Sequence, residues 1–148
     1  MSGATVEYKF DALKRLTAAL QDAPREFRKL SRRALTEAGR DTEQRAISNA
    51  SFSSRIPSSI SLQVSFRSSR PRIILRASLA KAPHARVMEG ITAQGGMFEH
   101  PVFGNKREWV KQKARPYMAP AVRDTRIELN DKIEKVADDM IAKIASST

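Results

Sequence analysis

The chain has 148 residues, 41% hydrophobic and 29% charged, proportions that are ordinary for one folded domain. It contains no cysteine, which excludes disulfides, thiolate metal sites and a cysteine nucleophile. No apolar run is long enough to span a bilayer and the first residues lack the pattern of a secretory leader, so we expect neither membrane insertion nor secretion.

The formal net charge of +11 is concentrated in the middle of the chain. No acidic residue occurs between Glu43 and Glu89. The basic residues of that interval are Arg45, Arg55, Arg67, Arg70, Arg72, Arg76, Lys81 and Arg86. The segment is therefore expected to project positive potential, either toward an anionic neighbour or simply into solvent.

The N-terminal part, over about residues 11–50, is predicted to be helical. Apolar side chains recur at steps of three or four from Asp11 to Leu20, which indicates a short helix. A second apolar stripe among many charges runs from Pro24 to about Ala50, and proline is tolerated in a first helical turn. Gly39 lies inside this stripe and costs about 1 kcal/mol relative to alanine, so it is a point where the helix can be interrupted.

Residues 60–80 are predicted to form a β-hairpin, because apolar and polar residues alternate on both sides of the turn sequence "RSSRP". The apolar set is Ile60, Leu62, Val64, Phe66, Ile73, Leu75 and Leu79. A two-stranded hairpin is marginal alone and has two open edges. We expect a third strand to come either from the segment "MFEHPVF" or from a neighbouring copy of the chain.

The segment 84–112 is predicted to be an extended loop arm, since four of the six glycines fall between Gly90 and Gly104. Three of the nine aromatic residues also lie there: Phe98, Phe103 and Trp109. Aromatic side chains dominate protein interfaces, so this arm is a candidate contact surface. The alternative is that the arm folds back on the core of its own chain.

Residues 117–145 carry the clearest helical pattern, with apolar side chains at steps of three or four and charges of both signs between them. Together these elements predict an α+β fold. Two long helices pack on a small antiparallel sheet, the hairpin with or without a third strand, and the extended arm is attached. We expect residues 1–148 to form a single domain.

The sequence gives little sign of catalysis. His84 and His100 are the natural candidates, with Glu99 beside the second, but they do not form the paired spacing of a metal site. A small basic nuclease using both histidines would need only these residue types, and nothing in their spacing favours it. Nucleotide-binding and hydrolase motifs do not occur. We therefore expect no enzymatic activity, no catalytic or metal-binding residues and no cofactor, with both histidines making local hydrogen bonds.

The polar face of the predicted hairpin carries basic side chains: Arg67, Arg70, Arg72 and Arg76. Such a surface can contact phosphates, but a single-strand binder also needs exposed rings for stacking. Two interpretations stay open. The face is solvated or meets an acidic protein partner, or it faces DNA, in which case the chain is a basic nucleic-acid-binding protein.

Three short motifs carry a resemblance to a known family. They are "HARVMEG" at residues 84–90, "HPVFGN" at residues 100–105 followed by a tryptophan, and "ARPYMAPAV" at residues 114–122. In this order, between a long central helix and a C-terminal helix, they resemble the head–tail joining and tail-completion proteins of long-tailed bacteriophages. The similarity runs from about Tyr8 to the C-terminal helix. The chain departs from the family pattern at "ITAQGG", which follows Gly90 in place of a direct strand.

The resemblance implies a structural virion protein without enzymatic activity, located at the neck or at the top of the tail, and in the host cytoplasm during assembly. Its partners would be copies of itself in a homo-oligomeric ring, a hexamer being one candidate size, and the connector, tail terminator and tail tube. Passing DNA would be a non-specific contact, and no membrane is involved. The expected subunit or partner contacts are Met97, Phe98, His100, Pro101, Val102, Phe103, Trp109, Arg115, Pro116 and Tyr117.

Overall fold

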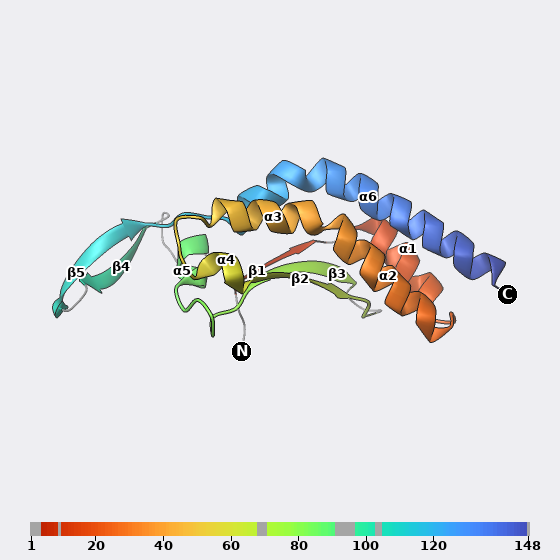
Figure 1. Cartoon of the computed structure of the whole chain (residues 1–148), viewed down its shortest axis with the longest axis horizontal. Coiled ribbons are helices and arrows are strands. Elements are labelled where there is room, and N and C mark those ends of the chain that lie inside the picture. Colours follow the sequence, from red (N-terminus) through yellow and green to blue (C-terminus); the bar gives the residue numbers. More distant parts are fainter. Residues whose placement is uncertain (1–3, 9, 68–70, 91–96, 103–104, 148) are drawn as a thin grey trace.

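The computed structural model describes residues 4–8, 10–67, 71–90, 97–102 and 105–147. It confirms an α+β fold: helices cover one face of a small antiparallel sheet, and a separate two-stranded hairpin extends from one end of an elongated body (Figure 1). The elements in chain order are β1 Ala4–Tyr8, α1 Asp11–Leu20, α2 Arg25–Ala38, α3 Arg40–Asn49, α4 Ile56–Ser59, β2 Ile60–Ser65, β3 Arg72–Ala77, α5 Ala85–Glu89, β4 Met97–Val102, β5 Asn105–Lys113 and α6 Met118–Ser146. Within the described residues, no helix has the length and apolar character needed to cross a membrane.

The predicted central helix is present as two helices, α2 and α3, that meet at Gly39. Hydrogen bonds of helical spacing continue through the junction, from Gly39 N–H to Leu35 and from Glu43 N–H to the carbonyl of Gly39. A Cβ atom at Gly39 would lie only 2.8 Å from Leu62 Cδ1 on the sheet. The glycine therefore allows the helical pair to pass closely over β2, and the two helices change direction there (Figure 1).

The predicted hairpin is β2 and β3, and the third strand of its sheet is β1, from the N-terminus, in the order β1-β3-β2. Val6 of β1 and Leu62 of β2 both lie opposite Leu75 of the central strand. This corrects the expectation that "MFEHPVF" or a neighbouring copy supplies the third strand. Met97–Val102 pairs instead with β5 in the separate hairpin.

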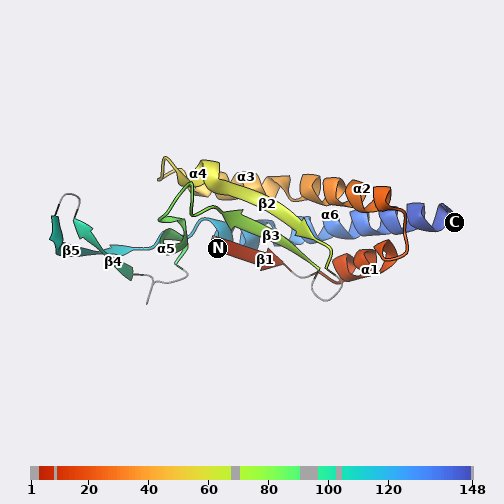
Figure 2. The ribbon, with the colours of Figure 1, turned by 90° about the horizontal axis from the view of Figure 1, so that it is seen from below.

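The two faces of the three-stranded sheet differ because side chains alternate along each strand. Ile73, Leu75 and Ala77 are buried under the helices. Arg72, Ile74 and Arg76 point to the opposite face, which none of the described helices covers (Figure 2). The backbone N–H of Leu62 donates to Glu43 Oε2 of α3 at 3.0 Å, so this part of the β2 edge is occupied by a side chain from a helix.

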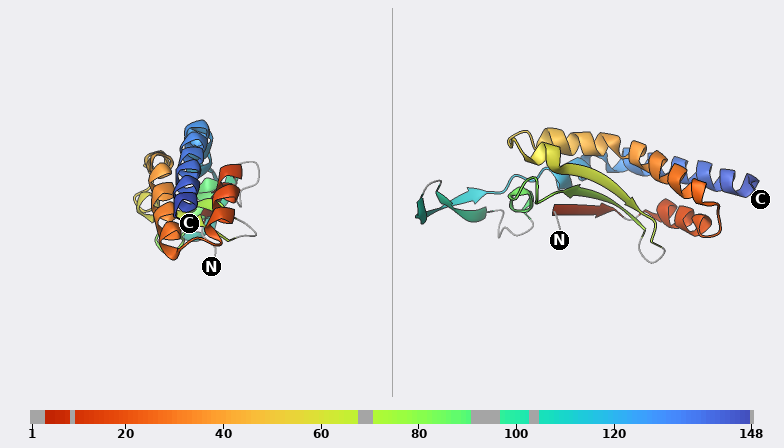
Figure 3. Two further views of the ribbon diagram at one scale, coloured as in Figure 1. Left: turned by 90° about the vertical axis from the view of Figure 1, so that its right-hand side faces the viewer. Right: turned by 60° about the horizontal axis from the view of Figure 1, so that its bottom comes forward.

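The apolar core consists of two adjoining clusters beneath the helices. One cluster lies near α3, α5 and the start of α6 and includes Ile56, Leu75 and Tyr117. The other lies near α1, α2 and the middle of α6 and includes Leu13, Leu35 and Ile133. Leu62 and Val122 pack against both clusters. α6 therefore connects the whole length of the body, from the root of the projecting hairpin to the far end (Figure 3).

A buried pair of hydroxyls links α3 to α6. Thr42 Oγ1 and Thr125 Oγ1 are 2.7 Å apart, and Thr125 Oγ1 also donates to the carbonyl of Ala121. Since the Thr125 proton is used by Ala121, Thr42 is the donor of the pair. The two helices are thus joined by a polar contact inside an apolar layer.

We predict that Thr125→Val costs about 1–3 kcal/mol, because it leaves the buried Thr42 hydroxyl without an acceptor. Thr42→Val should cost less, and the double variant should return close to the wild-type free energy of unfolding. Urea denaturation of the four proteins measures this. A double variant as unstable as the sum of the two single variants would contradict the pairing.

Candidate assembly interface

The projecting hairpin is attached to the body at a point built around one buried carboxylate, that of Glu89. Glu89 is the last residue of α5 and is only 7% exposed. Its Oε2 atom accepts hydrogen bonds from the backbone N–H groups of Tyr117 at 2.8 Å and Met118 at 2.9 Å. Its Oε1 atom accepts one from Ala119 at 2.7 Å. The Glu89 side chain therefore caps the N-terminus of α6.

This cap provides acceptors for the backbone N–H groups at the start of α6. The first N–H groups of a helix have no acceptor within the helix, and a negative charge is favourable at that end. Glu89 accepts from the cap residue Tyr117 and from the first two helical residues, and the next residue, Pro120, has no N–H to satisfy. The cap thus brings together two of the motifs noted in the sequence, "HARVMEG" and "ARPYMAPAV". The bonded residues are 28 to 30 positions apart in the chain.

Tyr117 reinforces the same junction. Its ring is completely buried, its hydroxyl donates to the carbonyl of Ala85 at 2.8 Å, and its carbonyl accepts from Asn49 Nδ2 at 3.2 Å. Burial, and then the nearby negative charge of Glu89, raises the pKa of Tyr117 above its usual range. The prediction of a partner contact at Tyr117 is corrected, because its side chain is enclosed by its own chain and packs edge-on against Phe52.

The chain leaves the body and returns to it at neighbouring positions. Gly90, directly after Glu89, has φ +94°, a left-handed conformation that side chains other than glycine rarely adopt. A Cβ atom at Gly90 would lie 3.6 Å from the Cβ of Ala114, which directly follows β5. The two ends of the arm are thereby held side by side at its root.

The predicted loop arm contains regular structure instead, with α5 at its start and the antiparallel pair β4 and β5 beyond it, here called the arm hairpin. Its register places Met97 opposite Lys113 and Glu99 opposite Lys111. The strands β4 and β5 pack chiefly on each other, and the hairpin points away from the body (Figures 1 and 3). The sequence does not indicate these strands because β5, "NKREWVKQK", is mostly charged and has no continuous apolar face.

The arm hairpin has one face partly turned to the body and one turned outward. Phe98 is half-buried against the first core cluster, so this residue follows the alternative in which the arm packs on its own chain. Met97 is 41% exposed and Trp109 is 59% exposed. The side chains of His100, Pro101 and Val102 and the whole of Phe103 lie outside the described residues. Of the predicted aromatic contacts in the described residues, Trp109 is therefore the one with an exposed side chain.

Two other predicted contacts lie at the root of the arm hairpin. Arg115 is exposed, and its guanidinium carbon lies 4.4 Å from the centroid of the Phe52 ring, a cation–π contact that holds the side chain over the loop after α3. Pro116 is exposed beside it. These two residues remain available at the surface next to the arm hairpin.

The predicted basic surface is only partly assembled on one face. Arg67 is exposed, whereas Arg72 and Arg76 are half-buried on the open face of the sheet and each already interacts within the chain. Arg70 lies outside the described residues. Phe66, the aromatic residue nearest to this group in sequence, is buried, with Arg28 and Arg32 of α2 over its ring.

His84 makes a local contact, as expected. Its Nε2 atom is 3.1 Å from Ser53 Oγ, and the same oxygen accepts from the backbone N–H groups of Arg55 and Ile56. Ser53 thereby shapes the start of α4. The described residues contain no group of three or more side chains that could hold a metal ion. The side chain of His100 lies outside the described residues.

A hollow of about 910 Å³ lies between the loop after α3, helix α5 and the base of the arm hairpin. Phe52, Met88 and Phe98 form its apolar part, and Arg55, His84 and Gln112 are among its polar lining residues. The hollow is open to solvent and lies beside Arg115.

Comparisons of this chain with protein-family models, with curated proteins and with solved structures gave no match.

We predict that Glu89→Ala lowers the free energy of unfolding by about 3 kcal/mol or more, because three enclosed N–H groups lose their charged acceptor. Glu89→Gln should fall between this variant and the wild type, since one amide oxygen replaces two carboxylate oxygens. Chemical denaturation measures both variants.

The matched control is Glu99→Ala on the exposed arm hairpin, which should change the free energy of unfolding by less than about 0.5 kcal/mol. Equal effects of Glu89→Ala and Glu99→Ala would contradict the role assigned to Glu89.

Proposed function

We propose that this protein is a structural component of the virion of a long-tailed phage. It forms a homo-oligomeric ring at the neck or at the top of the tail, completes the tail and joins it to the head connector. The observation that carries the proposal is the arm hairpin, which projects from the body with Trp109 and Met97 exposed and with a firmly capped root. The motif resemblance to head–tail joining and tail-completion proteins supports the same assignment.

The mechanism is steric and adhesive. A two-stranded hairpin consists of two edge strands, and β1 is an edge strand of the body sheet among the described residues. Contacts made by a projecting element of one copy on a different surface of the next copy repeat around a ring when the rotation closes. The ring would then contact the connector on one side and the tail terminator or tail tube on the other.

A basic nucleic-acid-binding protein is the second candidate, supported by Arg67, Arg72 and Arg76 beside the open face of the sheet. The described side chains of that face are Thr5, Ser61, Gln63, Ser65, Arg72, Ile74 and Arg76. None of them is aromatic, so they offer no ring on which a base could stack. DNA contact there would be electrostatic, and its affinity would fall steeply with added salt.

We predict that a phage whose copy of this gene is interrupted produces filled heads and separate tails, and that adding the purified protein to the lysate joins them. A variant in which residues 91–113 are replaced by a short Gly-Ser linker should keep its helical circular dichroism signal but fail to join them. The body is retained in this variant because Gly90 and Ala114 are already adjacent.

Mass spectrometry of gradient-purified particles provides the direct count. Absence of the chain from finished particles would refute the virion role, and salt-sensitive retention of DNA by the same protein would then favour the second candidate.

A further inference from the structure

We infer that the occupant of the outward face of the arm hairpin is a second copy of this chain, bound at a groove between the start of α1 and the middle of α6. This inference rests on the proposed ring and deepens it by naming the two surfaces that meet. The groove has a volume of about 390 Å³ and lies at the end of β1. It is lined by Phe10, Asp11, Arg126, Ile127, Asn130 and Asp131.

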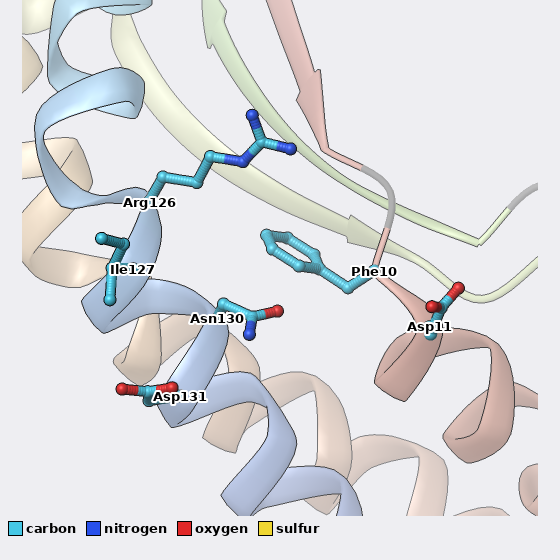
Figure 4. Close-up of a pocket in the computed structure, with 6 residues that line it drawn as sticks. All are labelled: Phe10, Asp11, Arg126, Ile127, Asn130 and Asp131. Atoms are coloured by element: carbon cyan, nitrogen blue, oxygen red, sulfur yellow. The ribbon is translucent and has the colours of Figure 1, made fainter.

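The groove contains an apolar side chain that the fold does not use. Ile127 is 81% exposed on α6, although the other large aliphatic residues of this helix face the core or its margin. Figure 4 shows the ring of Phe10 pointing from the start of α1 toward α6, with Asn130 facing it and Ile127 and Asp131 further round the helix. An isoleucine at so exposed a position gains nothing for the stability of the single chain, and covering it removes apolar area from water.

The outward face of the arm hairpin carries exposed apolar side chains that can cover the exposed Ile127 of the groove. The exposed apolar residues of the arm hairpin are Met97 and Trp109. Both lie on the same face, because Trp109 is paired with Pro101, which is four residues from Met97 along β4, and side chains an even number of residues apart in a strand share a face. Tryptophan is among the residues that carry most of the binding energy at interfaces. An exposed indole ring on one surface and an exposed isoleucine in a groove on another surface can form a heterologous contact.

The charges of the two surfaces are complementary. The outward face of the arm hairpin carries Lys111 and Lys113 against one acid, Glu99. The groove carries the carboxylates of Asp11 and Asp131 against one guanidinium, that of Arg126. Opposite net charge on the two surfaces favours their approach and disfavours pairing of two arm hairpins with each other.

The contact cannot form within one chain. The arm hairpin projects from one end of the body, whereas the groove lies between α1 and α6, and α1 lies toward the other end (Figure 1). In an assembly, the arm hairpin of each copy therefore binds the groove of one neighbour, and its groove binds the arm hairpin of another neighbour. Such a chain of contacts closes into a ring or continues as a filament.

Sedimentation velocity of the purified full chain at low salt tests this assignment. The wild-type protein should form a concentration-dependent oligomer, and Trp109→Ala and Ile127→Asp should each weaken self-association by at least about thirtyfold, as expected for central contacts. The matched control is Leu30→Ala on α2, a residue that is also large, apolar and 48% exposed, and it should leave self-association unchanged. Unchanged thermal unfolding of each variant confirms that the body remains folded.

A charge-reversal pair makes the test specific. Lys111→Glu places an acidic hairpin beside an acidic groove, and Asp131→Lys places a basic hairpin beside a basic groove, so each variant alone should sediment as a monomer. An equimolar mixture should assemble again, because alternating copies restore opposite charges at every contact.

A wild-type protein that stays monomeric at all concentrations, whether or not it binds DNA, overturns the inference, as does an oligomer that is unaffected by Trp109→Ala. These outcomes are independent of whether the chain is found in phage particles, so failure of this contact is distinguishable from failure of the proposed function.

Discussion

The structure depends on the carboxylate of Glu89 at the N-terminus of α6. Burying a carboxylate costs free energy unless the carboxylate is hydrogen-bonded. Burying the first N–H groups of a helix also costs free energy unless they find an acceptor. The hydrogen bonds between Glu89 and the start of α6 remove both costs at once. The three N–H groups lie at 2.7–2.9 Å from the Glu89 oxygens, distances typical of charge-assisted bonds. Because Gly90 follows Glu89 and Ala114 precedes this helix start, the same interaction fixes both ends of the arm. The longest helix of the body and the root of the projecting hairpin are therefore held by one contact.

The body and the arm hairpin differ in how their side chains are buried. The body buries its apolar residues between the helices and one face of the sheet, and Phe98 extends that core to the base of the arm hairpin. Beyond Phe98 every described side chain of the two strands is exposed, and an isolated two-stranded hairpin is marginal in water. A partner that covers Trp109 and Met97 would supply the missing layer, which is why a binding role accounts for the arm better than a role in the stability of the single chain. The exposed Ile127 of α6 is likewise an apolar side chain that the body leaves uncovered and that a partner would cover.

The sequence predicted the elements whose periodicity is strong and missed those whose pattern is local or distant. α1, α6 and the β2–β3 hairpin follow from regular apolar spacing, and the doubt about helix continuity at Gly39 corresponds to the close approach of Leu62. β1 was missed because five residues give too short an alternation, and β5 because most of its side chains are charged. The role of Glu89 has no local signature, since its acceptor function is defined by residues 28 to 30 positions later. A glutamate before a glycine and a proline just inside a helix start were the available signals. Ile127 could have been identified as an apolar residue outside the stripe of its helix, whereas the burial of Tyr117 depends on packing that spacing alone does not define.

Native-state amide hydrogen exchange tests the central role of Glu89 most directly, because it reports on the bonded N–H groups themselves. The account predicts that the amides of Tyr117, Met118 and Ala119 exchange as slowly as those in the middle of α6. The first turn of α1 provides the internal comparison, since its cap residue Phe10 makes no side-chain capping bond. Exchange of Tyr117, Met118 and Ala119 as fast as that of Asp11 and Ala12 would contradict the account.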